Sequence, residues 1–505
     1  MAVEGPGATP VPKSFHPLEA IVTLGGIQAL TMLAGLARTK ALALMLGPDG
    51  VGIVSVIDQV VALVAQLGSL SIPFVALKFL ARARDGEANQ TRRIYDALVM
   101  LLAIASVVSA AIGTAIAVIH PTTFGDGLAP YRTVLIVALI GVPPLAIAPL
   151  LRNAMAALDR HRESALAAFA GAVLTVVGAI VGMKAGGLIG LYVANAVVLV
   201  VTIAGMQWYL GESLGLRLAL DTSRGAIGRA FESRPGVFSF AASMYVLALT
   251  SPFAYLLARS LLLSRHGAIE AGLVAAAYGI AVSVRLVLNQ ANGLYLTPLV
   301  NRATAKADRT AAVAEYLRIL LVIVVSSTML IVLFPRQWIT LLYSAEFVDA
   351  VPMVTVFVLG EAVLLLAGVY QALLIGFDDI SGFLVSTVTG HVVTIALAGL
   401  LVGREGGMGV GIAFLAGNAV ILVATSVRLL RAHGARSLAA PLLPLTAAMA
   451  TLAVAGWWSE VFDPPAVLRG VTYLAVCGVA LLFLRPDERR WIMRPLQGLG
   501  SARTR

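Results

Sequence analysis

Uncharged apolar stretches of about 20 residues follow one another along almost the whole of this chain of 505 residues. Hydrophobic residues make up 59% of the sequence and charged residues 12%, whereas a soluble domain has about 25% charged residues. A helix of about 20 apolar residues is long enough to cross the roughly 30 Å of hydrocarbon in a bilayer. The stretches do not alternate in polarity, which excludes the strands of a membrane β-barrel. The sequence therefore predicts an all-α polytopic membrane protein.

About fourteen transmembrane helices are expected. Their predicted ranges are 18–37, 51–77, 94–119, 131–151, 164–183, 187–210, 236–258, 271–300, 317–335, 350–374, 382–402, 408–427, 440–458 and 466–484. We divide the chain into a cytoplasmic N-terminal tail (1–17), an N-lobe of six helices (18–210), a cytoplasmic inter-lobe loop (211–235), a C-lobe of six helices (236–430), two additional C-terminal helices (431–484) and a basic cytoplasmic tail (485–505).

The two six-helix units resemble each other at an offset of about 220 residues. The matching segments are 36–39 with 257–260, 47–52 with 267–272, 124–126 with 347–349, and 157–159 with 376–378. An even number of spans in each unit gives both copies the same orientation in the membrane. Two such repeats are expected to enclose a central cavity and to rock around it, which is the geometry of alternating access.

The positions of the cations predict the orientation of the chain. With both termini placed in the cytoplasm, 26 of the 36 Lys and Arg residues fall on the inner side, as the positive-inside rule requires. The net charge of +10 is therefore mostly a topology signal, and nucleic acid is not an expected partner.

Several function classes lack their motifs in this sequence. There is no phosphate-binding loop of the Gly-x4-Gly-Lys-[Ser/Thr] type, no Cys/His set with metal-site spacing, and no Ser/His/Asp or nucleophile-elbow pattern. The loops between spans are too short to hold a catalytic site. We therefore expect no enzyme activity, no metal and no cofactor, and we expect transport to be driven by an ion gradient or by the membrane potential.

Cations inside or beside the predicted spans are the main candidates for a substrate site, because a charge at mid-depth in a bilayer is expensive unless it faces a polar interior. Arg285 stands alone near the middle of its span, and Asn289 and Asn292 lie on the same helical face. Arg38 recurs in the repeat as Arg259. Snorkelling to the outer headgroups is the alternative interpretation for Arg38, Arg259 and the neighbouring Lys40.

Isolated acids and one histidine within the spans are the candidates for ion coupling. Asp58, Glu361 and His391 are each remote from other charges along the sequence. Each has a structural alternative. Either carboxylate can serve as the partner of a basic residue, and His391 can be a hydrogen-bonded packing residue.

The arrangement of two parallel six-helix repeats, the turn at 46–52 and the stretch 342–347 resemble the multidrug/oligosaccharidyl-lipid/polysaccharide (MOP) exporter superfamily. Within it, the chain is most similar to polysaccharide-biosynthesis flippases of the O-antigen (Wzx-like) type. The segments 35–38 and 285–286 are also similar to the arginines of the first and eighth helices in MurJ-type lipid II flippases, which have a cationic cavity.

This resemblance implies a flippase that moves an undecaprenyl-diphosphate-linked oligosaccharide from the cytoplasmic to the outer leaflet of a bacterial inner membrane. It also implies that the last two spans flank a groove for the lipid tail, and that polysaccharide polymerase or assembly proteins are partners. A lipid II flippase and a MATE-like ion-coupled multidrug antiporter remain as alternatives. An excess of basic over acidic candidates favours an anionic substrate, since guanidinium groups bind phosphates bidentately.

Overall fold

The computed structural model describes residues 17–83, 88–216, 237–291, 296, 306–434, 442–482 and 484. Within these ranges the chain is almost entirely helical and contains no β-strand, so the predicted all-α fold is confirmed. The α-helices are α1 (Pro17–Ser69), α2 (Ile72–Ala83), α3 (Ala88–Ile119), α4 (Arg132–Ile140), α5 (Val142–Ala157), α6 (His161–Leu214), α8 (Val237–Ala291), α10 (Lys306–Leu333), α11 (Pro335–Leu342), α12 (Val351–Gly376), α13 (Ile380–His433), α14 (Leu442–Phe462) and α15 (Ala466–Leu482). Short 3₁₀ segments are η1 (Pro121–Phe124), η2 (Asp126–Tyr131) and η4 (Ala345–Ala350).

Four of the longest helices bend at glycine. The bends are at Gly47 in α1, Gly186 and Gly187 in α6, Gly267 in α8, and Gly406 in α13. We call the part of each helix before its bend the first arm and the part after it the second arm. In the described residues, eight helical segments, including these four, are long and apolar enough to cross a membrane. The chain is therefore a polytopic helical membrane protein.

The sequence repeat is visible in the backbone. Residues with a left-handed φ recur in pairs 219 or 220 positions apart: Gly47 (63°) with Gly267 (83°), Asp159 (58°) with Asp378 (57°), Gly187 (57°) with Gly406 (53°), and Gly215 (67°) with Gly434 (64°). Because a residue with a side chain rarely adopts such a φ, the pairs mark equivalent bends and helix ends. We call α1–α6 the N-lobe and α8–α13 the C-lobe.

Two predicted spans differ from the helices in the structure. The span predicted at 51–77 is broken at Leu70 and Ser71, which both have a positive φ, and α2 begins just before Pro73. The span at 131–151 is likewise divided at Gly141, ahead of two prolines at the start of α5. Proline lacks a backbone N–H and fits only the first turn of a helix, which explains why both breaks precede proline.

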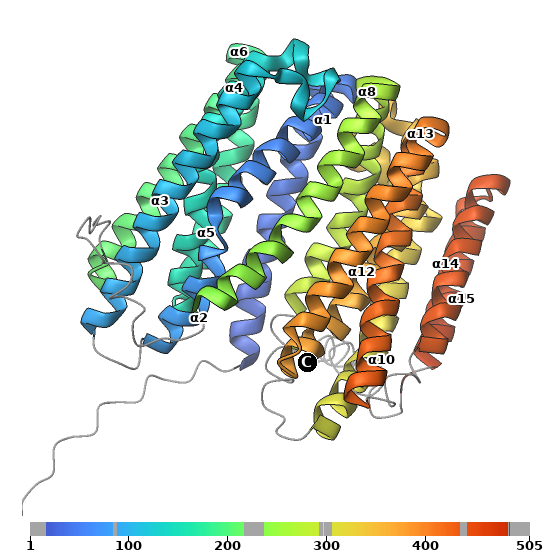
Figure 1. Ribbon diagram of the computed structural model, residues 1–505. Coiled ribbons are helices and arrows are strands. Elements are labelled where there is room, and N and C mark those ends of the chain that lie inside the picture. Colours follow the sequence, from blue (N-terminus) through green and yellow to red (C-terminus); the bar gives the residue numbers. More distant parts are fainter. Residues whose placement is uncertain are drawn as a thin grey trace, which may run out of the picture.

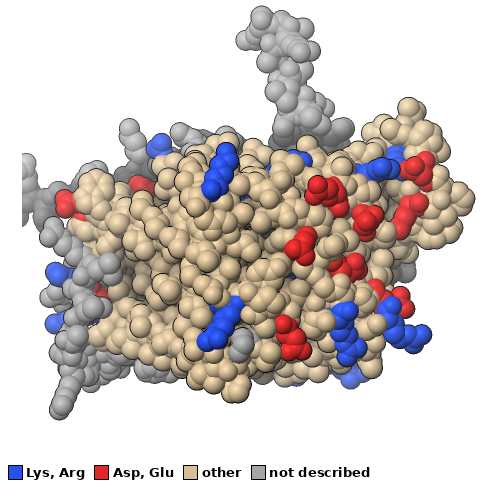
Figure 2. Space-filling view, turned by 90° about the horizontal axis from the view of Figure 1, so that it is seen from above, with Lys and Arg blue, Asp and Glu red and all other residues tan. Residues whose placement is uncertain are grey.

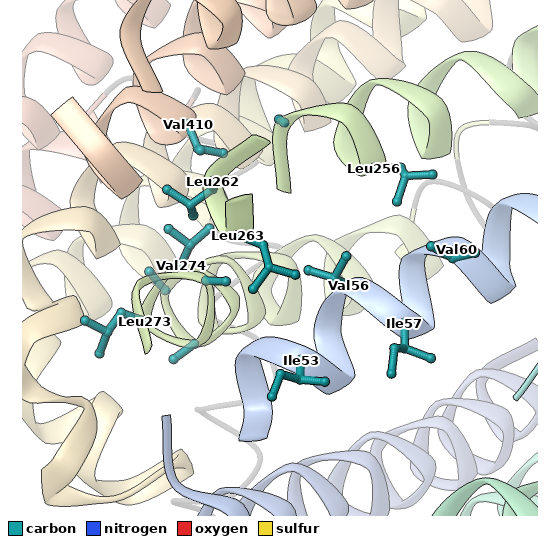
Figure 3. Close-up of a cluster of buried hydrophobic side chains, with 14 of the residues drawn as sticks. Ile53, Val56, Ile57, Val60, Leu256, Leu262, Leu263, Leu273, Val274 and Val410 are labelled. Atoms are coloured by element: carbon teal, nitrogen blue, oxygen red, sulfur yellow. The ribbon is translucent and has the colours of Figure 1, made fainter. Parts of the chain in front are cut away.

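The lobes lie side by side and join along the second arm of α1 and the first arm of α8 (Figure 1). Figure 3 shows this seam, in which Ile53, Val56, Ile57 and Val60 of α1 lie beside Leu256 and Leu263 of α8. Hydrogen bonds connect the same helices: Gln59 Nε2 donates to the Pro252 carbonyl (3.1 Å), and the Tyr245 hydroxyl donates to the Leu67 carbonyl (2.9 Å). Most of the seam is buried apolar surface, which stabilises the association of the lobes in this state.

The lobes approach most closely just beyond the bends of α1 and α8, at the upper end in Figure 1. A Cβ atom added to Gly52 would lie 1.9 Å from the Ala268 carbonyl oxygen, and one added to Gly272 would lie 1.9 Å from that of Pro48. Only glycine allows the backbones this close. The upper end is therefore closed between the lobes.

Charged side chains of both signs are scattered over this upper end among a broad uncharged surface (Figure 2). The positive-inside rule predicts that this end faces outward and that the opposite end faces the cytoplasm. Helices α14 and α15 lie at the far edge of the C-lobe (Figure 1), where Leu452 of α14 packs with Leu333 of α10 and Leu359 of α12.

Candidate functional site

A cavity of about 780 Å³ lies between the lobes, below the closed end. The first arm of α1, the second arm of α8 and the C-terminal end of α11 form its walls. Its polar lining residues are Gln28, Thr31, Arg38, Thr39, Ser283 and Tyr343. Arg38 is the one charged residue among those that line the cavity in the described part of the chain. The cavity therefore combines a mainly apolar wall with a single guanidinium group.

Arg38 has no counter-ion of its own in this cavity. Its Nε is buried and has no hydrogen-bond acceptor among the described residues. Asp58 is within electrostatic reach of both Arg38 and Arg259, but the Asp58 carboxylate already accepts a hydrogen bond of 2.9 Å from the Tyr192 hydroxyl. A buried cation whose donors are unused is unfavourable unless a ligand completes its bonds.

Lys40 has a different environment, although it is only two residues from Arg38. Its Nζ donates hydrogen bonds to the carbonyls of Thr340 (2.8 Å) and Tyr343. The last carbonyls of a helix lack intrahelical donors and carry the negative end of the helix dipole. Lys40 thus caps α11 of the opposite lobe and connects the lobes near the closed end.

Arg285 and Glu361 form an ion pair within the C-lobe, with 2.5 Å between Arg285 Nε and Glu361 Oε2. The Glu361 side chain is 2% exposed, and that of Arg285 is 26% exposed. Glu361 Oε1 is buried and has no hydrogen-bond partner among the residues that the structure describes. The pair joins α8 to α12. In this state Glu361 is therefore the partner of a basic residue, which is the structural alternative predicted for it from the sequence.

Arg259 lies over the ring of Tyr278, with 5.0 Å between the guanidinium carbon and the ring centroid. This cation–π contact belongs to a group of tilted and edge-on aromatic rings, Tyr255, Tyr278, Phe357 and Phe414. The rings provide a favourable electrostatic surface for a cation in an apolar region. Arg259 is therefore stabilised by aromatic faces where Arg38, its repeat partner, faces a cavity.

His391 joins the same group. Its ring meets Tyr255 edge-on at 6.3 Å between centroids, and its Nδ1 is buried without a hydrogen-bond partner among the described residues. The structure thus brings Arg259, Arg285, Glu361 and His391 together in the C-lobe, while Arg38 and Asp58 belong to α1.

Two of the predicted site residues cannot be placed. Asn292 lies outside the described residues, and so does the side chain of Asn289. Among the side chains that the structure does describe, no group of three or more His, Cys, Asp or Glu residues is arranged to hold a metal ion.

Sequence reasoning missed the tyrosines of the site. Tyr192, Tyr255 and Tyr278 all lie within long apolar helices. Tyr192 contacts Asp58, Tyr278 contacts Arg259, and Tyr255 contacts Tyr278 and His391. A buried tyrosine hydroxyl usually needs a polar partner, so tyrosine within an apolar span is itself a signal for a polar site.

No family model matches the chain. It is 24% identical to the lipid III flippase of Escherichia coli K12 over 389 residues, which cover 76% of this chain and 91% of that protein; the lipid III flippase of Shigella flexneri gives the same values. An inward-facing multidrug resistance MATE transporter of the MOP superfamily superposes with a TM-score of 0.60 at 17% identity, covering 82% of this chain and 95% of that one. A MOP superfamily transporter from Pyrococcus furiosus also superposes at 0.60, with 18% identity and coverage of 83% and 97%. The chain has the fold of the MOP superfamily.

The resemblance to the MOP superfamily predicted from sequence is thereby confirmed. An outward-facing MATE transporter superposes on the same MOP fold with a TM-score of 0.58, at 17% identity and coverage of 81% and 94%. This TM-score is close to the 0.60 of the inward-facing structure, so the superpositions do not distinguish the two conformational states. The contacts within the chain itself are the better guide to its state. These contacts close the upper end at Gly52 and Gly272.

Proposed function

We propose that this protein is a flippase that moves an undecaprenyl-diphosphate-linked oligosaccharide from the cytoplasmic to the outer leaflet of a bacterial inner membrane. The observation that supports this most is Arg38, which lines a cavity of about 780 Å³ between the lobes and whose buried Nε has no acceptor among the described side chains and carbonyls. The sequence similarity to lipid III flippases supports a lipid-linked substrate.

The chemistry of the cavity fits an anionic head group beside an apolar tail. A diphosphate that leaves water needs charge-assisted hydrogen bonds, and a guanidinium group supplies two parallel ones. The lining provides one such group and no acid among its described residues. A cationic drug in the same place would face the unpaired Arg38, which disfavours a MATE-like multidrug antiporter.

The geometry fits alternating access in a state that is open to the cytoplasm. The lobes touch at Gly52 and Gly272 near the upper end, and the cavity extends from Arg38 towards Gln28, near the start of α1. Rocking of the lobes about the cavity would separate the glycines and open the upper end. The lipid tail would remain in the bilayer during this movement.

An ion gradient or the membrane potential is the proposed source of energy. Asp58, Glu361 and His391 stay the candidates for ion coupling. Glu361 and His391 each have a buried atom without a hydrogen-bond partner among the described residues, which is a place where a proton or cation can bind. Polysaccharide polymerase or assembly proteins are the proposed partners of the flippase.

A flipping assay in proteoliposomes tests the proposal. We would compare the wild type, Arg38→Gln, and the control Arg132→Gln, which changes an exposed arginine at the start of α4. With an undecaprenyl-diphosphate oligosaccharide, Arg38→Gln should slow flipping about tenfold or more, because one charge-assisted hydrogen bond is worth about 1.5–3 kcal/mol. The control should match the wild type.

The same assay separates the alternatives. Lipid II flipped faster than the oligosaccharide would favour a peptidoglycan-precursor flippase, and proton-coupled export of a cationic dye would favour an antiporter. Equal flipping by the wild type and Arg38→Gln, with both proteins folded, would overturn the role of the central cavity.

A further inference from the structure

A second cavity, of about 710 Å³, lies within the N-lobe. The first arm of α1, helix α5 and both arms of α6 surround it. Its polar lining residues are Gln28, Thr31, Arg152, Asn153, His161, Ser164, Thr175 and Thr202. We call it the N-lobe pocket. It is slightly smaller than the central cavity and more polar, and the function proposed above does not use it.

Arg152 on α5 is the fixed charge of the N-lobe pocket. Its side chain is half-buried and makes no hydrogen bond or ion pair within the described part of the chain; only its backbone carbonyl is used, by the Ser164 hydroxyl (3.1 Å). The described lining contains no Asp or Glu. The nearest acids along the chain have neighbours of their own: Glu163 lies 3.8 Å from the Arg160 guanidinium, and Asp159 lies 3.8 Å from His161 Nε2.

The C-lobe carries a different residue at the equivalent position. At the repeat offset of 219, Arg152 corresponds to Gln371, whose Nε2 donates to the Thr387 hydroxyl (2.9 Å). The glutamine is therefore satisfied within its own lobe. An unpaired arginine appears in one copy of the duplicated unit, where the other copy has a neutral and hydrogen-bonded side chain.

The packing of the two lobes also differs at equivalent positions. In the C-lobe, a Cβ atom on Gly390 would lie 2.2 Å from the Ile421 side chain, so the arms of α13 are in direct contact. In the N-lobe, the same register pairs Gly171 with Thr202, and the distance is 3.3 Å. The arms of α6 are therefore also in contact here but less tightly packed than those of α13, with the smaller Thr202 where the C-lobe has Ile421. The N-lobe pocket thus lies where the side chains of the two copies differ.

The N-lobe pocket and the central cavity share a wall. Gln28 and Thr31, on the first arm of α1, line both of them. Arg152 lies on one side of this stretch, and Arg38 lies further along the same arm on the other side. Both arginines lack a bonded partner in the described residues, and two neutral polar side chains of α1 border both cavities.

We propose that the N-lobe pocket is a second phosphate-binding site, in which Arg152 holds the diphosphate of the lipid-linked substrate before Arg38 binds it in the central cavity. This inference rests on the proposed flippase function and adds an entry site to it. Arg152 supplies the bidentate charge-assisted contact, and Gln28 and Asn153 supply neutral amide donors. Asn153 also donates to the Pro73 carbonyl (2.9 Å), which fixes its position.

Equilibrium binding of farnesyl diphosphate to the full-length protein tests this site without relying on flipping. The protein is placed in phosphatidylcholine nanodiscs, and the number of bound molecules is measured by calorimetry. Arg152→Gln introduces the residue that the chain itself has at the repeat position. Arg152→Lys keeps a cation there, and Arg160→Gln changes a neighbouring surface arginine that lies outside the pocket lining.

The wild type and Arg160→Gln should bind two molecules. Arg152→Gln and Arg38→Gln should each keep one site of wild-type affinity. The affinity of the other site should fall about tenfold or more. Arg152→Lys should keep two sites, the second with lower affinity. Two full-affinity sites in Arg152→Gln would overturn the inference while leaving the proposed function intact, if Arg38→Gln still loses one. No change in either variant would count against both.

A second arm of the experiment identifies the source of the phosphate. Replacing phosphatidylcholine by phosphatidylglycerol should leave both molecules of farnesyl diphosphate bound. Loss of only the Arg152-dependent molecule would assign the pocket to a bilayer phospholipid and would overturn its role as an entry site for substrate.

Discussion

Arg285 and Glu361 are paired inside the C-lobe, with the guanidinium group contributed by the second arm of α8 and the carboxylate by the middle of α12. A buried pair of this kind couples two helices, because either charge left alone in an apolar region is unfavourable. The carboxylate has one oxygen on Arg285 and a second buried oxygen that finds no partner in the described part of the chain. The pair is therefore both a structural connection and a place where a proton or cation would change the balance of charge.

Glu361→Gln should destabilise the protein by about 3 kcal/mol, because it leaves the Arg285 charge without its partner. The double variant Arg285→Met/Glu361→Leu should be within about 1 kcal/mol of the wild type, since both buried charges are then absent. Unfolding in mild detergent, followed by helix content, measures the difference. The control is Glu163→Gln, which removes a partly exposed partner of Arg160 and should have a small effect. A double variant as unstable as Glu361→Gln would contradict this account.

The sequence singled out both members of this pair but assigned them separate roles. Each is an isolated charge in an apolar stretch, which the cost of burial makes conspicuous. Their separation of 76 residues along the chain contains no information about which helices are neighbours. The identity of a buried charge was therefore predictable, and its partner was not.

Arg38 and Lys40 illustrate a second limit. The prediction treated them as one group because they are close in sequence. Successive residues of a helix are rotated by about 100°, so positions two apart point to different faces. Arg38 accordingly lines the cavity, while Lys40 reaches α11. Helical periodicity was enough to predict that the two side chains point in different directions. What each side chain contacts depends on the packing of the lobes.

Lys40→Met should loosen the closed upper end, because the last carbonyls of α11 lose their cationic donor. A cysteine at Thr39, which lines the cavity, reports this opening through its rate of reaction with a membrane-impermeant thiol reagent, in a Cys477→Ser background. We expect the rate to rise about fivefold or more, as expected for losing about 1 kcal/mol or more of hydrogen bonding. Lys184→Met, an exposed lysine beside the bend of α6, should leave the rate unchanged. Equal rates in both variants would show that Lys40 does not hold the upper end closed.

Gly272→Ala should prevent full closure of the upper end. The added methyl group would lie 1.9 Å from the Pro48 carbonyl oxygen, so α1 and α8 must separate by at least about 1 Å. Spin labels on the two lobes, measured by pulsed electron resonance, should show a larger distance at this end, and flipping should slow. The matched control is Gly470→Ala in α15, where no atom lies within 4 Å of the new methyl group. An unchanged distance distribution would argue against glycine contact as the basis of closure.

Asp379 is the N-cap of α13 and lies between two predicted spans, where water is accessible. Its carboxylate accepts hydrogen bonds from Arg428 (2.7 and 3.1 Å), from the Gly382 amide (2.9 Å) and from the Ser381 hydroxyl (3.0 Å), and it contacts His433 Nε2 at 2.9 Å. The Arg428 hydrogen bonds, together with the contact to His433 and the backbone amide, hold the pKa of Asp379 well below its usual range.

A carboxylate with a lowered pKa stabilises the folded state at a pH above its unfolded value of about 3.9, and this contribution is lost as the pH falls further towards the folded pKa. Asp379→Asn should therefore lower the unfolding temperature at pH 7, and its difference from the wild type should shrink below about pH 4. Asparagine still caps the helix, so the variant isolates the charge. Asp378→Asn changes an exposed neighbour with a left-handed φ of 57°, which asparagine tolerates, and it should show no such trend. A difference between Asp379→Asn and the wild type that stays constant from pH 7 to pH 3 would mean that this ion pair does not contribute to the acid sensitivity of the fold.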